Sequence, residues 1–115
     1  MEIGVDIEKN ERFKTVSKHF LERVYTQNEL LYAHKHKNSH EHLCAFWCAK
    51  EATVKAFSNL KIPFLEIEIS ATPEGKPFIV KNETILNELK KANCTEIKIS
   101  LSHSKDYSTA TCIIY

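Results

Sequence analysis

The 115-residue chain is 43% hydrophobic, as is typical of one compact globular domain, so we expect residues 1–115 to form a single domain. Its 16 basic and 15 acidic residues give a net charge of +1, which excludes the strong positive field of a general nucleic-acid binder. The sequence has neither a signal-peptide pattern nor the roughly 18 apolar residues of a membrane span, which predicts a cytoplasmic protein without membrane contact. Its four cysteines lack framework spacing and are expected to be reduced core residues.

The first predicted element is a strand over residues 2–8, because apolar and polar residues alternate along it. One face carries two isoleucines and a valine, and the opposite face is acidic and contains a glycine. The residues of that acidic face are Gly4, Asp6 and Glu8. Residues 9–24 change to a helical spacing of apolar residues, and we expect a single helix there with a basic outer side. That basic side is either a solvated helix face or a docking surface for an acidic partner.

Residues 26–29 have the form of a capping box and predict the start of a second helix. The stretch that follows, residues 34–42, is too polar for the core and is expected to be an exposed connection or a helix end. Its four histidines are His34, His36, His40 and His42. They offer a second interpretation, a structural metal site. No cysteine or carboxylate at the usual spacing completes a ligand set there, which favours the exposed connection.

Residues 47–57 contain no glycine or proline and predict the central helix of the fold. Apolar residues occupy nearly all of its circumference, so the helix is expected to be buried. Glu51 and Lys55 nevertheless share one narrow stripe of it, although a buried helix should not carry charge. This conflict is the first indication of a functional site. Lys50 lies about 100° from Glu51 around the helix and faces a different direction.

The C-terminal half predicts two antiparallel strand pairs separated by a helix. The predicted strands are residues 64–71, 77–81, 96–102 and 108–114. Gly75 lies in the turn of the first pair, where it is free to take positive φ. Asn82 can cap a helix over residues 83–92, with Ile85 and Leu86 directed inward. Helices grouped on one face of antiparallel strands predict an α+β fold in which an antiparallel sheet packs against the long central helix.

Two carboxylates stand on elements that must pack together, Asp6 on the first strand and Glu51 on the central helix. Magnesium prefers such oxygen ligands, and two converging carboxylates leave positions for water and phosphate oxygens. Lys55, Lys76 and His103 would add positive charge to hold phosphate. Each residue alone has an ordinary explanation, as a turn cap, a helix-surface ion pair or a surface histidine. Together they indicate a site for magnesium and a diphosphate.

Four segments resemble the motifs of a known enzyme family. Residues 4–8 (GVDIE) and 47–55 (WCAKEATVK) resemble the two signatures of the 4′-phosphopantetheinyl transferases. Residues 74–78 (EGKPF) and 102–107 (SHSKDY) resemble the short branch of that family, the holo-acyl-carrier-protein synthases. The resemblance implies transfer of the phosphopantetheine arm of coenzyme A to a serine of apo-acyl carrier protein, for fatty acid biosynthesis. Adenosine 3′,5′-bisphosphate would be the second product.

The resemblance also implies roles for individual residues. Asp6 and Glu51 would ligate Mg²⁺, and Lys55 would lie near the phosphates of coenzyme A. The residues near the nucleotide part, with its 3′-phosphate, would be Gly75, Lys76, Pro77 and His103. Phosphoryl transfer depends on positioning and on charge neutralisation, which agrees with these roles. Either Glu51 or a metal-bound water would take the proton of the serine hydroxyl.

The basic side of residues 9–24 gains a partner under this resemblance, because acyl carrier proteins are acidic. The residues of the docking surface would be Arg12, Lys14, Lys18 and Arg23. Short members of the family form trimers with active sites between subunits, which implies a homotrimer. Phe46 stands where that branch often has arginine, which removes a charge from a phosphate or carrier contact. The competing interpretation is a non-catalytic module, either a histidine metal site or a degenerate transferase fold that only binds a carrier protein.

Overall fold

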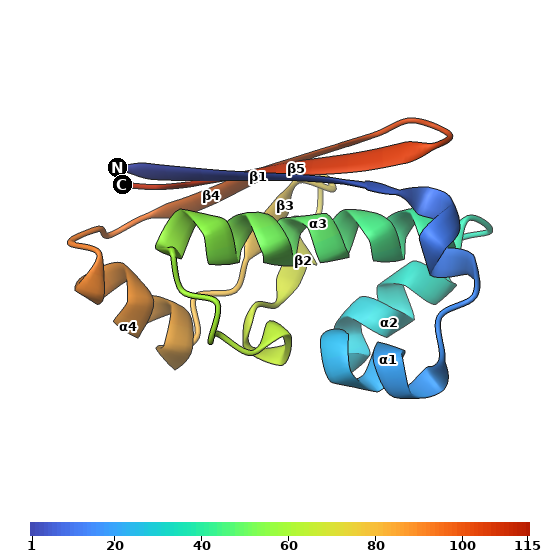
Figure 1. The fold of residues 1–115 in the computed structure, drawn as a ribbon, viewed down its shortest axis with the longest axis horizontal. Helices are drawn as coiled ribbons and strands as arrows, with labels where there is room; N and C mark the ends of the chain where they lie inside the picture. The colour runs from blue at the N-terminus through green and yellow to red at the C-terminus, as the bar shows by residue number, and fades with distance from the viewer.

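The computed structural model describes residues 1–115, and its centre is a three-stranded antiparallel sheet lying across one long helix (Figure 1). The strands, in the spatial order β1-β5-β4, are β1 (Glu2–Lys9), β5 (Tyr107–Ile114) and β4 (Ile97–His103). The long helix is α3 (Ser39–Phe57). A separate hairpin pairs β2 (Ile69–Ala71) with β3 (Pro77–Ile79). The predicted α+β fold, an antiparallel sheet on a long central helix, is confirmed.

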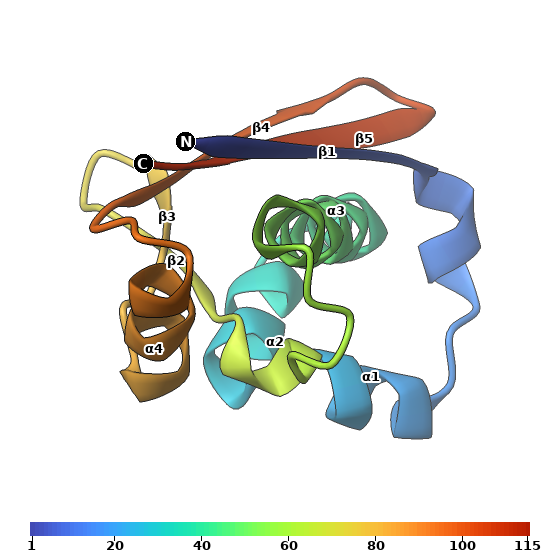
Figure 2. The ribbon, with the colours of Figure 1, turned by 60° about the vertical axis from the view of Figure 1, so that its left-hand side comes forward.

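Three shorter helices lie on the side of α3 away from the sheet, as Figure 2 shows. They are α1 (Lys18–Val24), α2 (Gln27–His34) and α4 (Glu83–Lys91), and two 3-10 turns complete the fold, η1 (Asn10–Lys14) and η2 (Phe64–Glu66). Helices and sheet bury one hydrophobic cluster of 24 residues, so α3 is enclosed on most sides as expected. All four cysteines are buried and free. No helix has the length and apolar character needed to cross a membrane.

The single helix predicted over residues 9–24 is wrong. β1 continues into this segment, η1 follows as a 3-10 turn, and α1 begins only after a break. Asn10 causes the first interruption, because its side-chain amide donates to two carbonyls of the β4–β5 turn at 2.9 and 3.0 Å. Ser17 causes the second, because its hydroxyl accepts a hydrogen bond from a first-turn amide of α1 at 3.0 Å and starts a new helix.

The strand predicted over residues 64–71 is wrong in its first half, which forms η2, and only β2 pairs with β3. The cause is the side chain of Lys50. Its ammonium group donates to the carbonyl oxygens of Phe64 and Ile67 at 2.7 Å each, and the segment curls around it. β3 is likewise shorter than the strand predicted over residues 77–81.

Several local predictions are confirmed. Thr26 and Glu29 form the capping box at the start of α2. Asn82 is the N-cap of α4, and its side chain accepts a hydrogen bond from the first turn at 2.9 Å. Gly75 has a φ of +90°, as its turn requires. Leu86 is an exception, because it was expected to face inward and is 50% exposed.

β1 meets α3 through its acidic, glycine-containing face. Gly4 lies so close to the helix that a Cβ atom added to it would stand 2.0 Å from the carbonyl oxygen of Ala52. Only glycine permits this approach. The other face carries Ile3, Val5 and Ile7, whose exposed fractions are 65%, 58% and 63%. The sheet therefore turns a row of large apolar side chains away from the core, and we call this row the outer face of β1.

Candidate active site

Asp6 and Lys55 join β1 to α3 close to the Gly4 contact. Lys55 Nζ lies 3.2 Å from Asp6 Oδ1 and donates to the carbonyl oxygen of Val5 at 3.0 Å. The backbone at Asp6 is fixed from the other side by β5, where Thr109 Oγ1 donates to the Asp6 carbonyl oxygen at 2.7 Å. The Lys55 side chain is 50% exposed, so its ammonium group is accessible to a bound anion.

Glu51 stands one helical turn before Lys55, on the same side of α3. Burial raises the pKa of the Glu51 carboxyl above its ordinary value, and the nearby Asp6 carboxylate raises it further. The ammonium group of Lys55 opposes this shift. Two carboxylates that repel each other in a partly buried position are stabilised by a cation between them.

The donor set of Asp6 and Glu51 fits a small divalent cation. Both residues supply carboxylate oxygen, which hard cations prefer, and their mutual repulsion favours a bound positive charge. No third histidine, cysteine, aspartate or glutamate joins them in a closed metal cluster. Two protein ligands leave coordination positions for water and phosphate oxygens, as Mg²⁺ requires.

Arg12 borders this pair of carboxylates from η1. Its Nη1 atom lies 2.6 Å from Glu8 Oε2, and its guanidinium carbon lies 5.2 Å from the centre of the Trp47 ring. The Trp47 ring itself packs among three phenylalanines of η1, α1 and η2. Arg12 is therefore held by an ion pair and an aromatic ring at the edge of the site.

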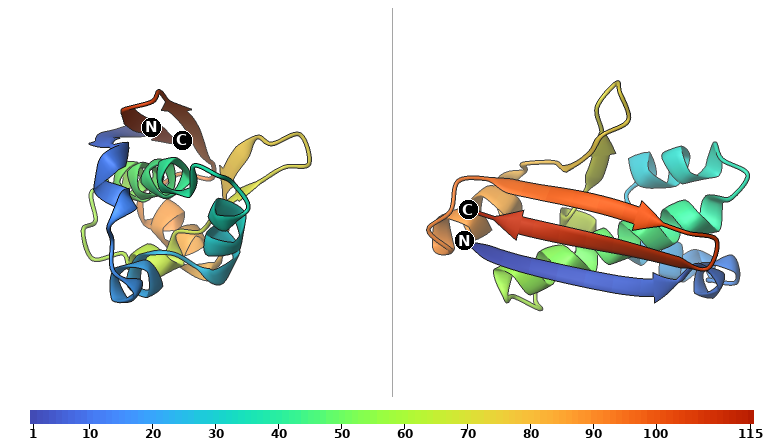
Figure 3. Two further views of the ribbon diagram at one scale, coloured as in Figure 1. Left: turned by 90° about the vertical axis from the view of Figure 1, so that its right-hand side faces the viewer. Right: turned by 90° about the horizontal axis from the view of Figure 1, so that it is seen from above.

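A cavity of about 550 Å³ opens at the opposite edge of the sheet, between α2, α3, β4 and the β2–β3 hairpin, and we call it the hairpin cavity. Figure 3 shows the arrangement: β1 forms one edge of the sheet, and the hairpin stands beyond β4 at the other edge. Gly75, Pro77 and His103 line the hairpin cavity, and Phe46 forms part of its wall. No aspartate or glutamate lines it.

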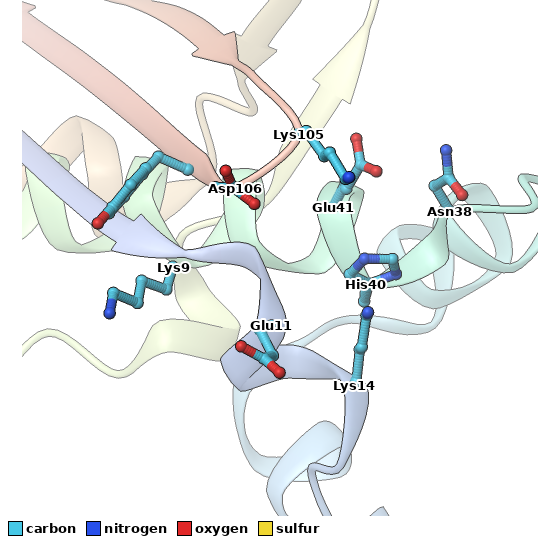
Figure 4. Close-up of a pocket in the computed structure, with 9 residues that line it drawn as sticks. Lys9, Glu11, Lys14, Asn38, His40, Glu41, Lys105 and Asp106 are labelled. Carbon is cyan, nitrogen blue, oxygen red and sulfur yellow. The ribbon is translucent and has the colours of Figure 1, made fainter.

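A second cavity, of about 630 Å³, lies where β1 ends and α3 begins (Figure 4). Its walls come from β1, η1, the start of α3 and the β4–β5 turn. Three lysines and three carboxylates line it: Lys9, Lys14, Lys105, Glu11, Glu41 and Asp106. Because these charges balance, this cavity does not favour an anion over a cation.

Comparison with known proteins gives the family of the chain. The model of the 4′-phosphopantetheinyl transferase superfamily matches residues 2–112. The chain belongs to this superfamily. Within it, the holo-[acyl-carrier-protein] synthase of Aquifex aeolicus is 42% identical over 119 residues, covering 97% of this chain and 96% of that protein. The synthase of the same name from Leptospira biflexa is 34% identical, covering 100% of this chain and 96% of that protein.

Solved structures of phosphopantetheinyl transferases share the fold. The holo-[acyl-carrier-protein] synthase of Neisseria meningitidis matches with a TM-score of 0.88 and 25% identity, covering 99% of this chain and 97% of that chain. The Helicobacter pylori synthase, whose structure is a complex with coenzyme A, matches with a TM-score of 0.82 and 27% identity, covering 98% and 99%. The resemblance carried by the sequence motifs is confirmed.

The predicted site residues of this transferase fold fall into two separate groups. The first group is Asp6, Glu51 and Lys55, and the second is Gly75, Pro77 and His103. The first lies at the β1 edge of the sheet and the second at the β4 edge, with β5 between the two edge strands. Lys76 is exposed and lines neither cavity, although it adjoins Gly75 in the hairpin.

The four basic residues predicted to dock a partner do not share one helix face. Arg12 pairs with Glu8 in front of α1, and Lys14 lines the cavity of Figure 4. Only Lys18 and Arg23 belong to α1, where both are exposed. The single basic helix face is therefore wrong, while a role in docking stays a prediction.

Lys50 is the residue of the 47–55 motif whose role the sequence left open. It is 0% exposed, and its Nζ atom lies 2.9 Å from Oε1 of Glu29, which is 1% exposed. Burial lowers the pKa of Lys50, and the Glu29 carboxylate opposes that shift. The buried charged residue of α3 is thus Lys50, while Glu51 is partly buried and Lys55 is exposed. The sequence signal for this pair was the capping box, because its glutamate, Glu29, caps α2 with one carboxylate group and can still bind a lysine with it.

Proposed function

We propose that the chain is a holo-acyl-carrier-protein synthase. It would transfer the phosphopantetheine arm of coenzyme A to a serine of apo-acyl carrier protein, as fatty acid biosynthesis requires, and release adenosine 3′,5′-bisphosphate. The observation that carries the proposal is the meeting of Asp6, Glu51 and Lys55 at the β1–α3 junction in a chain of this superfamily. The single buried cluster supports treating residues 1–115 as one transferase domain.

Asp6 and Glu51 would hold Mg²⁺ in this proposal. When bound, the cation supplies charge neutralisation at the diphosphate of coenzyme A. Lys55 adds a second positive charge, because its exposed ammonium group is free to exchange its contact with Asp6 for a phosphate oxygen. The serine oxygen forms a bond to the phosphorus that carries the pantetheine, and the bond from that phosphorus to the nucleotide phosphate breaks. The serine proton would pass to Glu51 or to water. Positioning and charge neutralisation are the main demands of such a transfer.

The nucleotide end of coenzyme A would enter the hairpin cavity. Gly75, Pro77 and His103 line this cavity, and its lack of carboxylates suits an anionic ligand. Lys76 would approach the nucleotide from the rim of the hairpin. The Tyr32 and Phe46 rings in the wall offer flat apolar surfaces of the kind on which a base packs.

The proposed assembly is a homotrimer, and the separation of the two groups supports a site shared between subunits. Within one chain the carboxylates and the hairpin cavity lie at opposite edges of the sheet, so one coenzyme A would use the carboxylates of one subunit and the cavity of its neighbour. The outer face of β1 supports subunit contact, because adjacent large apolar side chains are rarely left in water. The acidic carrier protein would approach Lys18 and Arg23 of α1, together with Arg12 and Lys14.

Mass spectrometry tests the activity. The protein is incubated with coenzyme A, Mg²⁺ and an apo-acyl carrier protein, and the expected result is a phosphopantetheine mass gain on the carrier. Asp6→Ala and Glu51→Ala should each lower the rate by about 100-fold or more, because each removes a charge that positions the diphosphate. Glu83→Ala is the matched control, since Glu83 is an exposed carboxylate of α4 far from the site.

Three results would reject the proposal: no mass gain with any acyl carrier protein tested, undiminished rates in both carboxylate variants, or an unchanged rate after chelation of divalent cations. The competing non-catalytic module predicts the first of these results. Sedimentation of the native chain measures its oligomeric state, and a monomer at the assay concentration would reject the shared site.

A further inference from the structure

One buried ion pair joins the helix that carries Glu51 to the walls of the hairpin cavity. Lys50 of α3 is 0% exposed and Glu29 of α2 is 1% exposed, and Lys50 Nζ lies 2.9 Å from Glu29 Oε1. The ammonium group also donates to the carbonyl oxygens of Phe64 and Ile67 at 2.7 Å each. Its three hydrogens are therefore all used by the protein, and none is left for a ligand. We call Lys50 and Glu29 the anchor pair.

The carboxylate of Glu29 extends the connection to two further elements. Its Oε1 atom accepts a hydrogen bond from the Thr26 amide, and its Oε2 atom accepts one from the Ile69 amide, at 2.8 Å each. The first amide belongs to the N-cap of α2 and the second to β2. Both elements line the hairpin cavity, α2 through Asn28 and its neighbours and β2 through Ser70. The anchor pair thus connects α3 to the cavity wall through direct hydrogen bonds.

The direction in which Glu51 points depends on how α3 is rotated about its own axis. Buried residues occupy nearly every side of α3, and several of them are alanines. Such a helix buries almost the same apolar surface after a small rotation, so hydrophobic burial specifies its rotation only weakly. Lys50 lies about 100° from Glu51 around the helix. Because the anchor pair fixes Lys50 against α2, it also fixes the direction of Glu51 towards β1.

A small rotation of α3 would be enough to disturb the site. The ends of helical side chains lie about 5–6 Å from the helix axis, so a rotation of about 10° moves a carboxylate by about 1 Å. A misplacement of about 1 Å costs a reaction about 100-fold in rate when positioning is critical. The same rotation would change the 3.2 Å contact between Lys55 Nζ and Asp6 Oδ1. Both charged residues of the α3 stripe therefore depend on how the helix is held.

Stability alone does not account for a buried ion pair at this place. Well-packed apolar residues of similar volume often stabilise a fold equally well, because taking two charges out of water is unfavourable. A fully hydrogen-bonded pair, in contrast, defines one geometry. We propose that the anchor pair is a positioning pair for phosphopantetheine transfer, which sets the rotation of α3 so that Glu51 and Lys55 face Asp6 and holds the wall of the hairpin cavity in a fixed relation to them. This inference rests on the proposed function.

The double variant Lys50→Met with Glu29→Gln tests the positioning role, because it removes both charges together and leaves none unpaired in the core. Its transfer rate is measured by mass spectrometry at a temperature well below its Tm, where circular dichroism shows it folded. We expect kcat to fall about 10- to 100-fold. Glu29→Asp is the second variant, which keeps the charge and shortens the side chain by one methylene. Its kcat should fall about three- to tenfold, because α3 must shift to keep the pair.

Metal binding gives a readout that does not depend on turnover. Mn²⁺ is titrated into the native protein and the variants in the presence of coenzyme A, and free Mn²⁺ is measured by electron paramagnetic resonance. The Kd for Mn²⁺ should rise about three- to tenfold in the double variant, because Asp6 and Glu51 would share the cation less well. Ile85→Ala is the matched control, since Ile85 is fully buried on α4 and lines neither cavity. It should lower Tm while kcat and the Kd for Mn²⁺ change by less than about twofold.

The outcomes separate the two proposals. If the double variant and Glu29→Asp both keep kcat and the Kd for Mn²⁺ within about twofold of the native values, the positioning role is overturned and the proposed function stays intact. An equal loss of kcat in Ile85→Ala also overturns the positioning role, because the loss would then follow from lower stability. If the native protein transfers no phosphopantetheine to any acyl carrier protein tested, the proposed function and the positioning role both fail.

Discussion

Replacing Lys50 with methionine is expected to be among the most destabilising single substitutions in the chain. The change keeps the length of the side chain and removes its charge. Lys50 Nζ now contacts Glu29 Oε1 at 2.9 Å and two carbonyl oxygens of the η2 segment at 2.7 Å each. In Lys50→Met these acceptors lose their donor, and the carboxylate of Glu29 stays buried with only backbone amides around it.

The size of the effect follows from the burial of both partners. Breaking a buried pair on one side costs about 3–5 kcal/mol, because it leaves an uncompensated charge. A chain of 115 residues has an unfolding entropy of about 0.24 kcal/mol/K at its midpoint, so this cost lowers Tm by about 12–20 °C. Adding Glu29→Gln to Lys50→Met should recover part of the loss, since no charge then remains buried.

Thermal unfolding followed by circular dichroism measures these shifts, at one fixed protein concentration because subunit assembly also stabilises the fold. Lys55→Met is the control on the same helix. The Lys55 side chain is 50% exposed in its pair with Asp6, and a pair with such access to water contributes about 1 kcal/mol or less. If Lys50→Met and Lys55→Met lower Tm by the same few degrees, the buried pair does not anchor α3 and the reasoning is refuted.

Three further changes test other parts of the fold. Gly4→Ala would place a methyl group 2.0 Å from the Ala52 carbonyl oxygen and should lower the free energy of unfolding, measured in urea, by about 3 kcal/mol or more. A decrease below about 1 kcal/mol would show that β1 can move away from α3. A hydrogen bond from Asn59 at 2.8 Å lowers the pKa of Glu88, so the stabilisation that this bond gives the fold is present at neutral pH and disappears as pH falls. Asn59→Ala should therefore lower Tm at about pH 7 and hardly at all at about pH 3. Equal losses of Tm at the two pH values would contradict this linkage. Burial raises the pKa of Cys112 to about 11, and all four thiols should react with Ellman's reagent only after unfolding; rapid labelling of the native protein would contradict their burial.

The periodic elements were predictable from sequence because each depends on its own residues. The apolar circumference of α3 and the alternation along β4 and β5 appear in the chain itself. The segment 9–24 was not predictable, since Asn10 interrupts it by binding the turn near residue 105. The strand predicted over residues 64–71 failed for the same kind of reason, through a contact with Lys50 on a distant helix.

In the candidate site, too, some features were predictable from the sequence and others depended on contacts between distant elements. Motif spacing predicted that Asp6, Glu51 and Lys55 belong together, and the β1–α3 contact brings them together. The spacing did not reveal that His103 and the hairpin lie at the far edge of the sheet, because that position depends on the order β1-β5-β4. A helical wheel also gives only the angle of Lys50, and not the presence of α2 and η2 above it.

The outer face of β1 has a consequence for how this protein is produced. β1 is an edge strand, so no neighbouring strand pairs with one side of its backbone, while Ile3, Val5 and Ile7 stand exposed beside it. A newly made chain with such an edge can pair with other chains before it reaches its proper neighbours. Recombinant yield should therefore depend on synthesis rate, with slow expression at low temperature giving native protein and fast expression giving inclusion bodies.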